Sequence, residues 1–356
     1  MYFKSIRKFF YKIANWESWH YHIKYIPIAP VWLWYCIKAR SLWFFTASNP
    51  TITFGGFEGE GKKEIYDQLP EKSFPVSVLA SHKLTFEEVN QLLISKHLDF
   101  PLVVKPDVGA MGYLFRKFSN ESQLRKYHSY VTIDYIIQEW IDYPIELSVF
   151  YYRMPDKKKG TITGMLMKEL PVVVGDGVHS LAELIMNNKV LKLNFDAICA
   201  RHKSSMQSII PKGKRFILSH ASNRSQGGKL ININHEIDEK ICSIFDGISN
   251  YSKGFFYGRF DLKCESLEGL RNGKNFSILE YNGSGAGIQH VYGNNLSLWK
   301  ACLTIVRHWE KLYQISRYNK KVNNGFYWKF SEGRKFLNKS MQHLKKLKNM
   351  DAAFPV

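Results

Sequence analysis

Two short segments, 258–262 and 276–282, carry polar residues at alternate positions, and this pattern constrains the fold more than any other feature. The first segment has Arg259 and Asp261 two positions apart, and the second has Glu280 and Asn282 in the same relation. Side chains two apart on a β-strand lie on one face of the sheet. If the two strands pair, four polar side chains converge on one face. The apolar residues between them are then expected to face a core: Phe260, Leu279 and Tyr281.

The four polar side chains have the chemistry of a metal and anion site. Asp261, Glu280 and Asn282 offer the hard oxygen ligands that magnesium prefers. Arg259 is a fixed cation beside them, suited to negative charge that develops on a carboxyl or phosphoryl oxygen. The competing interpretation is a set of solvated ion pairs across the strands. We favour the functional site because the neighbouring positions are apolar and a glycine-rich segment, 283–287, follows at once.

A lysine followed by a glycine-bearing loop forms a second block, at 101–112. Lys105 closes an apolar strand predicted at 100–105, and the loop after it contains Gly109, Ala110, Met111 and Gly112. A lysine at the end of a buried strand is unfavourable unless its ammonium reaches an anion. Glycines let backbone N–H groups approach phosphate oxygens. The block therefore indicates a phosphate site, with a capping lysine before an ordinary loop as the alternative.

The third block is the apolar strand predicted at 134–140. It ends in Gln138, Glu139, Trp140 and Ile141, and Glu146 follows shortly afterwards. Backbone groups at a strand end can pair with the edge of a purine, and a carboxylate nearby can reach ribose hydroxyls. Taken alone, the segment would be interpreted as a core strand with a surface acid.

Strands and helices alternate irregularly between these blocks. The patterns predict helices at 63–68, 85–97, 121–130 and 179–187, further strands at 113–118, 145–153 and 160–168, and a turn at 271–274. This mixture favours an α+β class with antiparallel sheets. The composition divides the chain into a basic aromatic segment at 1–48, a central region at 49–313 and a basic tail at 314–356. Within the central region we expect an N-lobe at about 75–140 and a C-lobe at about 141–313.

Both ends of the chain are strongly basic. Residues 1–48 hold seven Lys and Arg against one acid, and residues 314–356 hold ten against two. An N-terminal helix is predicted over residues 3–13, and the tail is predicted to be an amphipathic helix with Leu337, Met341 and Leu344 on one face. Such helices either pack on the body of the protein or lie on an anionic membrane.

The cysteines and the apolar runs indicate in which compartment the chain is expected to lie. The five cysteines are scattered without a Cys-x-x-Cys pair, which disfavours a disulfide framework or a zinc site and favours a reducing, cytoplasmic compartment. The apolar run at 26–37 contains two prolines and is too short to span a bilayer, which needs about 20 residues. We therefore expect a cytoplasmic protein, with peripheral contact at the inner membrane surface as an option for its basic ends.

The three blocks occur in the order and approximate spacing of the ATP-grasp superfamily. The chain resembles its carboxylate–amine ligases, notably D-alanine–D-alanine ligase and the ATP-grasp part of cyanophycin synthetase. This resemblance implies two α+β lobes with antiparallel sheets that sandwich a nucleotide. Two segments depart from the usual pattern: the loop after Gly112 lacks a further glycine, and Gly285-Ala286 replaces a usual Pro-Gly.

The resemblance also implies roles for individual residues. Lys105 would contact the ATP phosphates beneath a mobile loop at Gly109–Gly112. The segment from Gln138 to Ile141 would hold adenine, and Glu146 would hold ribose. Further ATP contacts are implied for Lys168 and Asn223. Two magnesium ions would be bound by Asp261, Glu280 and Asn282, and Arg259 would stabilise an oxyanion.

The expected activity is an ATP- and magnesium-dependent, ADP-forming ligation of a small carboxylate to an amine through an acyl phosphate. The substrates would be amino acids or peptide-like molecules. One alternative is an ATP-binding relative without ligase activity. Another is a basic module that binds membrane or nucleic acid, although no nucleic-acid-binding motif accompanies the basic ends.

Overall fold

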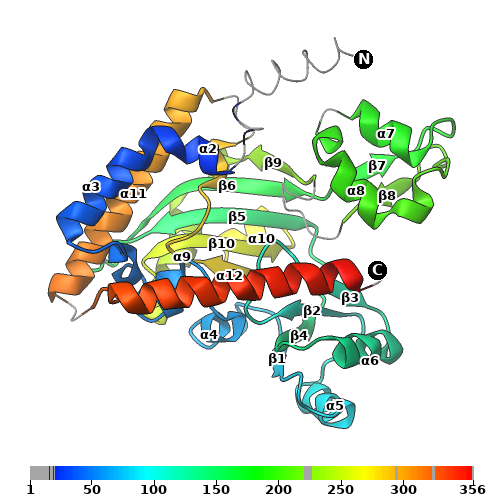
Figure 1. The fold of residues 1–356 in the computed structure, drawn as a ribbon, viewed down its shortest axis with the longest axis horizontal. Helices are drawn as coiled ribbons and strands as arrows, with labels where there is room; N and C mark the ends of the chain where they lie inside the picture. Colours follow the sequence, from blue (N-terminus) through cyan, green and yellow to red (C-terminus); the bar gives the residue numbers. More distant parts are fainter. Residues whose placement is uncertain are drawn as a thin grey trace. The chain divides into compact units, whose positions relative to one another are not determined.

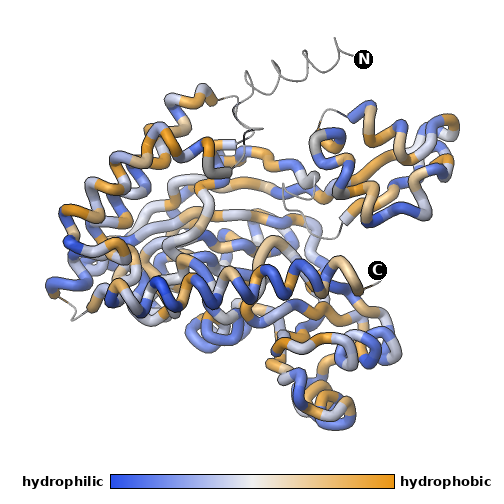
Figure 2. The backbone as a smooth tube through the Cα atoms, viewed as in Figure 1, coloured by the Kyte–Doolittle hydropathy of each residue, from blue (hydrophilic) through white to orange (hydrophobic). Residues whose placement is uncertain are grey.

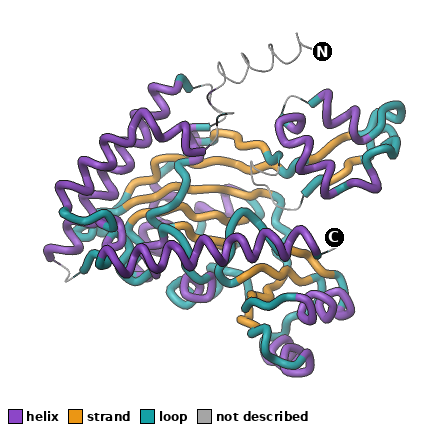
Figure 3. The backbone as a smooth tube through the Cα atoms, in the orientation of Figure 1, coloured by secondary structure: helices purple, strands orange, loops and turns teal. Residues whose placement is uncertain are grey.

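The computed structural model describes residues 16, 19, 21–188, 190–219, 227–292, 296–322 and 325–354, and the chain in it divides into two compact units. Unit 1 comprises Met1–Leu42, Lys168–Asn232 and Ile288–Lys311, and unit 2 comprises Trp43–Met167, Ile233–Gly287 and Leu312–Val356. The helix predicted at 3–13 lies outside the described residues. Figure 1 labels the elements, and Figure 3 distinguishes helices, strands and loops.

A four-stranded antiparallel sheet with the order β1-β4-β2-β3 forms one layer of unit 2. Its strands are β1 (Ser77–Ala80), β2 (Leu102–Pro106), β3 (Arg116–Phe118) and β4 (Tyr135–Glu139). Helices α5 (Phe86–Ser95) and α6 (Glu121–Tyr130) contribute to its core. Thr85 begins α5 with a capping box to Glu88, and Val89 and Leu93 carry the buried face of that helix.

A second, five-stranded sheet has the order β11-β10-β5-β6-β9. Its strands are β5 (Ile145–Tyr152), β6 (Thr161–Glu169), β9 (Lys229–Asn232), β10 (Tyr257–Cys264) and β11 (Phe276–Asn282). The pairings of β10 with β5 and β11 are antiparallel. The α+β class with antiparallel sheets is therefore confirmed, and so are most of the strands and helices expected in this part of the chain.

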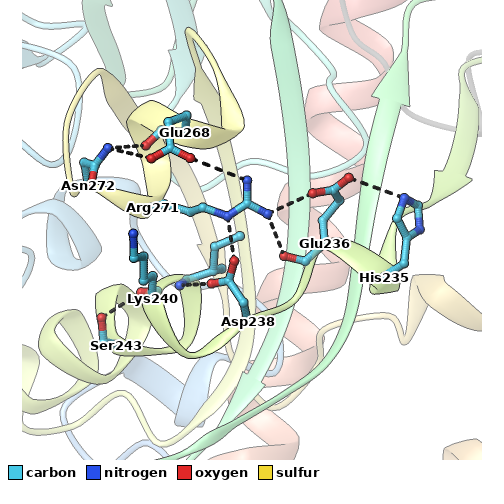
Figure 4. A network of polar contacts seen from close by, with 9 residues as sticks. His235, Glu236, Asp238, Lys240, Ser243, Glu268, Arg271 and Asn272 are labelled. Carbon is cyan, nitrogen blue, oxygen red and sulfur yellow. Dashed lines mark hydrogen bonds and ion pairs between the residues drawn. The ribbon is translucent and has the colours of Figure 1, made fainter.

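The connection between β10 and β11 corrects the sequence analysis. A short helix, α10 (Leu267–Arg271), precedes the turn that was predicted at 271–274. Arg271 forms ion pairs from its Nε to Asp238, at 2.6 Å, and from its Nη2 to Glu236, at 2.8 Å (Figure 4). Asp238 caps α9 (Glu239–Ser252), so this guanidinium joins α10 to the start of α9. Its role is structural.

The remaining helical elements of unit 2 surround the sheets. They are the 3₁₀ turns η3 (Phe44–Ala47), η4 (Thr53–Gly56) and η8 (Asn234–Glu236), the helix α4 (Lys62–Tyr66), the C-terminal part of α11 (Leu298–Val322) and α12 (Phe330–Ala353). The side chains of Ser316 and Asn319 on α11 donate hydrogen bonds to the carbonyls of Phe44 and Ala47. These bonds hold the N-terminal end of unit 2 against a helix 272 positions later in the chain.

The C-terminal helix α12 packs into the core of the four-stranded sheet (red in Figure 1). Leu347 and Phe354 are 1% and 7% exposed within that core. The basic helix predicted for the tail is thus present, but its face differs from the expected one. Met341 is 61% exposed, because Leu347 and Phe354 provide the main apolar contacts instead.

Unit 1 contains helices and a small antiparallel sheet. Its elements are α2 (Tyr21–Tyr25), η2 (Ile26–Ile28), α3 (Ala29–Ala39), β7 (Val172–Val174), α7 (Leu181–Asn187), η5 (Leu191–Asn194), α8 (Phe195–Arg201), η6 (Lys203–Ser205), β8 (Arg215–Ile217), β9, η9 (Gln289–Val291) and the N-terminal part of α11. Strands β7 and β8 pair over a core of α7 and α8 side chains. No helix among the described residues is long and apolar enough to cross a membrane.

Asn49 connects the N-terminal end of unit 2 to the start of β10. Its side chain is fully buried and donates to the carbonyls of Gly55 and Tyr257, at 3.0 and 2.9 Å. Its Oδ1 accepts from the amides of Phe256 and Tyr257, at 2.9 and 3.0 Å. One amide side chain therefore satisfies four buried backbone groups.

Replacement of Asn49 by alanine is expected to lower the free energy of unfolding by roughly 3 kcal/mol or more, because several buried backbone groups lose their partner. Denaturant titration followed by circular dichroism measures this change. Asn338→Ala, at an exposed position of α12, is the matched control and should change stability little. Equal stability of the two variants would contradict the role given to Asn49.

Candidate functional site

Strands β10 and β11 bring the four predicted polar residues together. Arg259 lies opposite Asn282 and Asp261 lies opposite Glu280 in the antiparallel register, so all four belong to one face. The guanidinium of Arg259 binds Asp261 through two hydrogen bonds, from Nε at 3.1 Å and from Nη2 at 2.9 Å. Its Nη1 donates to the carbonyl of Gly287 at 3.2 Å. The cross-strand convergence predicted from the sequence is present in the structure.

A β-bulge at Leu279 was not anticipated. The register shifts so that Glu280 pairs with Asp261 whereas Ile278 pairs with Leu262, which leaves Leu279 without a partner on β10. Ile278 and Tyr281 are buried, whereas Leu279 is only partly buried, contrary to the expectation that it faces a core. The bulge leaves the carbonyl of Leu279 available to other groups.

Lys105 binds that carbonyl. The lysine is 7% exposed, and its Nζ donates to the carbonyl of Leu279 at 3.0 Å and to the hydroxyl of Tyr66 at 2.8 Å. The Tyr66 hydroxyl lies 2.7 Å from the same carbonyl and 3.2 Å from Oε1 of Gln138. The lysine at the end of β2 therefore reaches the second sheet at the residue next to Glu280.

The charged groups around Lys105 and Glu280 shift the pKa values of both side chains. Burial and the nearby ammonium of Lys62 lower the pKa of Lys105, Glu280 raises it, and together they leave it at about 7. Burial alone would raise the pKa of Glu280, but Lys62, Lys105 and Arg259 outweigh it and hold the pKa below its ordinary value. Lys62 forms an ion pair with Glu280 at 3.2 Å. Glu280 is therefore a carboxylate among three cations.

Lys62 and Glu280 line a narrow cavity of about 30 Å³, which has room for a single water-sized group. It is lined by Glu60, Gly61, Lys62, Ile65, Tyr66, Gly109, Leu279, Glu280, Tyr281 and Asn282. Two of its polar atoms, Oε2 of Glu60 and Nδ2 of Asn282, are buried and have no hydrogen-bond partner in the described part of the chain. Burial raises the pKa of Glu60 to about 7. The cavity is therefore polar and buried, and it could form further hydrogen bonds with a bound group.

Sequence reasoning missed three polar side chains of this cavity: Glu60, Lys62 and Tyr66. They belong to α4 and the glycine-bearing segment before it, which was predicted only as a loop and a short helix. Asp107 holds α4 in place, because its Oδ1 and its carbonyl accept from the amides of Lys63 and Lys62. The cluster Gly59–Gly61 followed by two lysines was the available signal, but nothing local indicated that it lies beside β11.

The loop between β2 and β3 carries the glycines of the second block. Gly109 lines the cavity, and a Cβ there would lie 3.4 Å from Nζ of Lys62. Met111 and Gly112 adopt positive φ angles of 55° and 76°, and Met111 is 61% exposed. The loop therefore passes beside the ammonium of Lys62 before it turns outward.

The C-terminal helix fixes both ends of this loop. His343 on α12 donates from Nε2 to the carbonyl of Val108, at 2.8 Å. Asp351 accepts at Oδ1 from the amide of Leu114, at 2.8 Å, and from Nη1 of Arg116, at 3.0 Å. The exposed tip of the loop thus lies between two anchors that come from a helix more than 200 positions later.

Two cations flank the side chain of the residue after β4. The ring of Trp140 lies 3.8 Å from Nζ of Lys117 and 4.6 Å from Nζ of Lys263. Lys263 also donates to the carbonyl of Ile141 at 2.9 Å and lies opposite Glu146 in the register of β10 with β5. The predicted purine and ribose segments therefore meet at a cationic, aromatic surface.

The other predicted contacts occupy several positions. Glu139 accepts at Oε1 from the amide of Val76, and Gln138 is buried on β4. Lys168 is buried on β6, in unit 1. Asn223 lies outside the described residues. The roles given to Lys168 and Asn223 stay predictions.

Comparisons with known proteins give likenesses to ligases over part of the chain. No family model matches it. The alpha-aminoadipate–LysW ligase LysX of Sulfolobus acidocaldarius is 27% identical over 135 residues, which is 31% of this chain and 49% of that protein. The chain therefore spans about half the length of this curated relative.

Solved structures give a similar result. D-alanine–D-alanine ligase from Bacillus anthracis has a TM-score of 0.40 and 14% identity, over 73% of this chain and 68% of that one. The bifunctional glutathione synthetase from Pasteurella multocida has a TM-score of 0.38 and 19% identity, over 69% of this chain and 35% of that one. The ATP-grasp ligase PsnB has a TM-score of 0.37 and 13% identity, over 70% of this chain and 60% of that one. Because these identities and TM-scores are low, the functional proposal rests on the residues of the site itself.

Removal of the Asp351 carboxylate is expected to loosen the β2–β3 loop. In Asp351→Ala the amide of Leu114 loses its acceptor, so its hydrogen exchange should become about tenfold faster. Asp351→Asn is the matched control, because it keeps an oxygen acceptor for this amide while it removes the charge that Arg116 binds. Exchange at Leu114 that is equally slow in all three proteins would show that α12 does not anchor the loop.

Proposed function

We propose that this chain is an ATP- and magnesium-dependent ligase of the ATP-grasp type, which activates a carboxylate as an acyl phosphate and joins it to an amine. One observation carries the proposal: the buried ammonium of Lys105 binds the backbone of the strand that presents Glu280 and Asn282, and that strand pairs with Arg259 and Asp261. This arrangement combines cations for a polyphosphate with oxygen ligands for a divalent metal.

Lys105 and Lys62 would neutralise the phosphates, and backbone amides of the loop Gly109–Gly112 would cover them. Lys62 lines the polar cavity and forms an ion pair with Glu280, and Lys105 binds the carbonyl of Leu279, the residue before Glu280. Burial lowers the pKa of Lys105, and an anionic partner would stabilise its charged form. Adenine would lie near Trp140 and Ile141, and Glu146 would bind ribose. The cavity of about 30 Å³ is too small for a nucleotide, so only the groups nearest the metal would occupy it.

The residues of the site fit a magnesium ion. Glu280 is a carboxylate with 38% of its side chain exposed, Asp261 lies opposite it, and the amide of Asn282 would offer its Oδ1. The buried Nδ2 of Asn282, which has no hydrogen-bond partner among the described residues, would be a donor for a phosphate oxygen rather than a metal ligand. These three residues would hold the metal, and two ions are expected for a triphosphate. When bound, magnesium would neutralise charge on the phosphate oxygens.

The chemistry then follows two displacements. A substrate carboxylate oxygen bonds to the γ-phosphorus of ATP, the bond from that phosphorus to its bridging oxygen breaks, and ADP leaves. An amine nitrogen next bonds to the carbonyl carbon of the acyl phosphate, loses a proton, and inorganic phosphate leaves. Arg259, which binds Asp261, would stabilise the oxyanion of the tetrahedral intermediate.

The substrates we propose are an amino acid or a peptide-like carboxylate and a small amine. The segment after β11 replaces the usual Pro-Gly, and its backbone is held in place. The amides of Ser284 and Gly285 donate to the carbonyls of Gly55 and Gly56, each at 3.0 Å. A Cβ at Gly283 would lie 2.6 Å from the carbonyl oxygen of Gly55, so the two glycine segments need this close approach. In this chain the segment at the usual Pro-Gly is therefore held against η4.

The rival function is ATP binding without ligation. It is supported by the full engagement of the Arg259 guanidinium with Asp261 and Gly287, which would have to change for this group to bind an oxyanion. Activity and binding measurements on the same variants separate the two functions.

Replacement of Glu280 by glutamine should lower carboxylate activation by roughly 10²–10³-fold, because it removes a carboxylate ligand of the proposed magnesium ion, which neutralises the reacting phosphate. Hydroxylamine converts acyl phosphates to hydroxamates, so the assay combines ATP, magnesium, pools of amino acids and peptides, and hydroxylamine. The nucleotide product should be ADP rather than AMP. Glu87→Gln, with a side chain that is 75% exposed, is the matched control and should match the unaltered protein. Undiminished hydroxamate formation by Glu280→Gln would refute the site, whereas ATP binding without any hydroxamate would favour the rival.

Nucleotide binding should also take up protons at neutral pH. The pKa of Lys105 is about 7 in the free protein, and a bound triphosphate should raise it. The uptake should therefore increase as the pH rises from 6 to 8, because the free lysine loses its proton over that range while the bound lysine keeps it. Calorimetric titration with ATP in buffers of different ionisation enthalpy measures the number of protons. Lys105→Met should remove most of this uptake, and an unchanged proton count in that variant would contradict the assignment.

A further inference from the structure

Helix α3 of unit 1 exposes a continuous apolar stripe, which we call the α3 stripe: Leu33, Trp34 and Ile37. Their side chains are 55%, 53% and 68% exposed. Leu33 and Ile37 are four residues apart and Trp34 is adjacent, so the three lie on neighbouring positions of one helix surface. Figure 2 colours the backbone by hydropathy, and hydrophobic residues recur along this helix. Such a stripe is unusual on a surface that only contacts water.

The opposite side of α3 is already packed. Cys36 is 5% exposed, and Trp32 contacts the ring of Trp309 on α11 edge-on with ring centroids 5.0 Å apart. Tyr25, at the end of α2, stacks on the same ring at 5.9 Å. These contacts fix the rotation of the helix, so the α3 stripe is a consequence of how α3 is anchored.

Basic residues flank the stripe. Lys38 lies 5.1 Å from the ring of Trp34, and Arg40 ends the helix as its C-cap. Residues 21–40 contain three Lys and Arg and no Asp or Glu. Just before α3, Ile23 and Ile26 are 48% and 66% exposed. Exposed isoleucine, leucine and tryptophan beside basic groups and without acids are typical of helices that lie at a membrane interface.

We propose that the α3 stripe docks onto the surface of an anionic lipid bilayer. Charge complementarity favours lipid, because the exposed Lys38 and Arg40 would face anionic headgroups while the stripe enters the acyl boundary. The tryptophan suits this boundary, since its ring is apolar and its N–H is polar. The helix has 11 residues and would therefore lie in the interface rather than cross it. This inference does not depend on the ATP site.

The test uses the full-length protein and sedimentation with vesicles. One set of vesicles contains equal parts of phosphatidylcholine and phosphatidylglycerol, and the other contains phosphatidylcholine alone. The unaltered protein should sediment with the anionic vesicles and much less with the neutral ones. Ile37→Asn should weaken this binding about tenfold, because it places an amide in the acyl boundary. Lys38→Gln should weaken binding to the anionic vesicles only.

Ile94→Asn is the matched control. Ile94 is 66% exposed on α5, so Ile94→Asn is the same substitution at an exposed helical position without a neighbouring tryptophan. It should bind vesicles like the unaltered protein, and thermal unfolding should show that both variants are folded. Two results would overturn the proposal: equal vesicle binding by Ile37→Asn and Ile94→Asn, or no vesicle binding by the unaltered protein. Self-association without vesicles that Ile37→Asn abolishes would instead identify a protein interface and would also overturn it.

Discussion

The buried contact of Lys105 with the carbonyl of Leu279 is the interaction on which the site depends. It joins the end of β2 in one sheet to the bulge of β11 in the other, and the hydroxyl of Tyr66 completes the contact. The direct partners of this ammonium among the described residues are neutral, and burial together with the nearby Lys62 ammonium lowers its pKa to about 7. A bound triphosphate would therefore stabilise the positive charge of Lys105 beside Glu280.

Much of this site could be predicted from the sequence, because its signals are local. The period of two in β10 and β11 places Arg259, Asp261, Glu280 and Asn282 on one face, and the register confirms that placement. The apolar strand that ends in Lys105 indicated a buried cation. The strands and helices followed from periodicity and from capping residues such as Thr85.

The sequence did not predict the features that depend on contacts between distant segments. No local pattern marks the bulge at Leu279, since it arises from how β11 pairs with β10. The place of Lys62 depends on the docking of α4 against Asp107, 45 positions later. The apolar face of α12 was misjudged at Met341, because the hydrophobic pattern of a basic helix leaves several rotations open and only the sheet core selects Leu347.

The two basic ends of the chain, similar in composition, contribute in different ways. In unit 2, α12 buries its apolar face and fixes the loop between β2 and β3 through His343 and Asp351. In unit 1, α3 leaves an apolar stripe exposed between basic residues. Net charge alone could not distinguish these roles, because they are decided by which face of each helix finds an apolar partner.

The central claim is that Lys105 and Glu280 belong to one metal–triphosphate site. A crystal structure with manganese and a non-hydrolysable ATP analogue tests it most directly, because manganese gives an anomalous signal. We predict an anomalous peak bound by Glu280 and Asn282, with the β- and γ-phosphates beside the ammonium of Lys105. A nucleotide bound elsewhere, or a peak without these two ligands, would contradict the account.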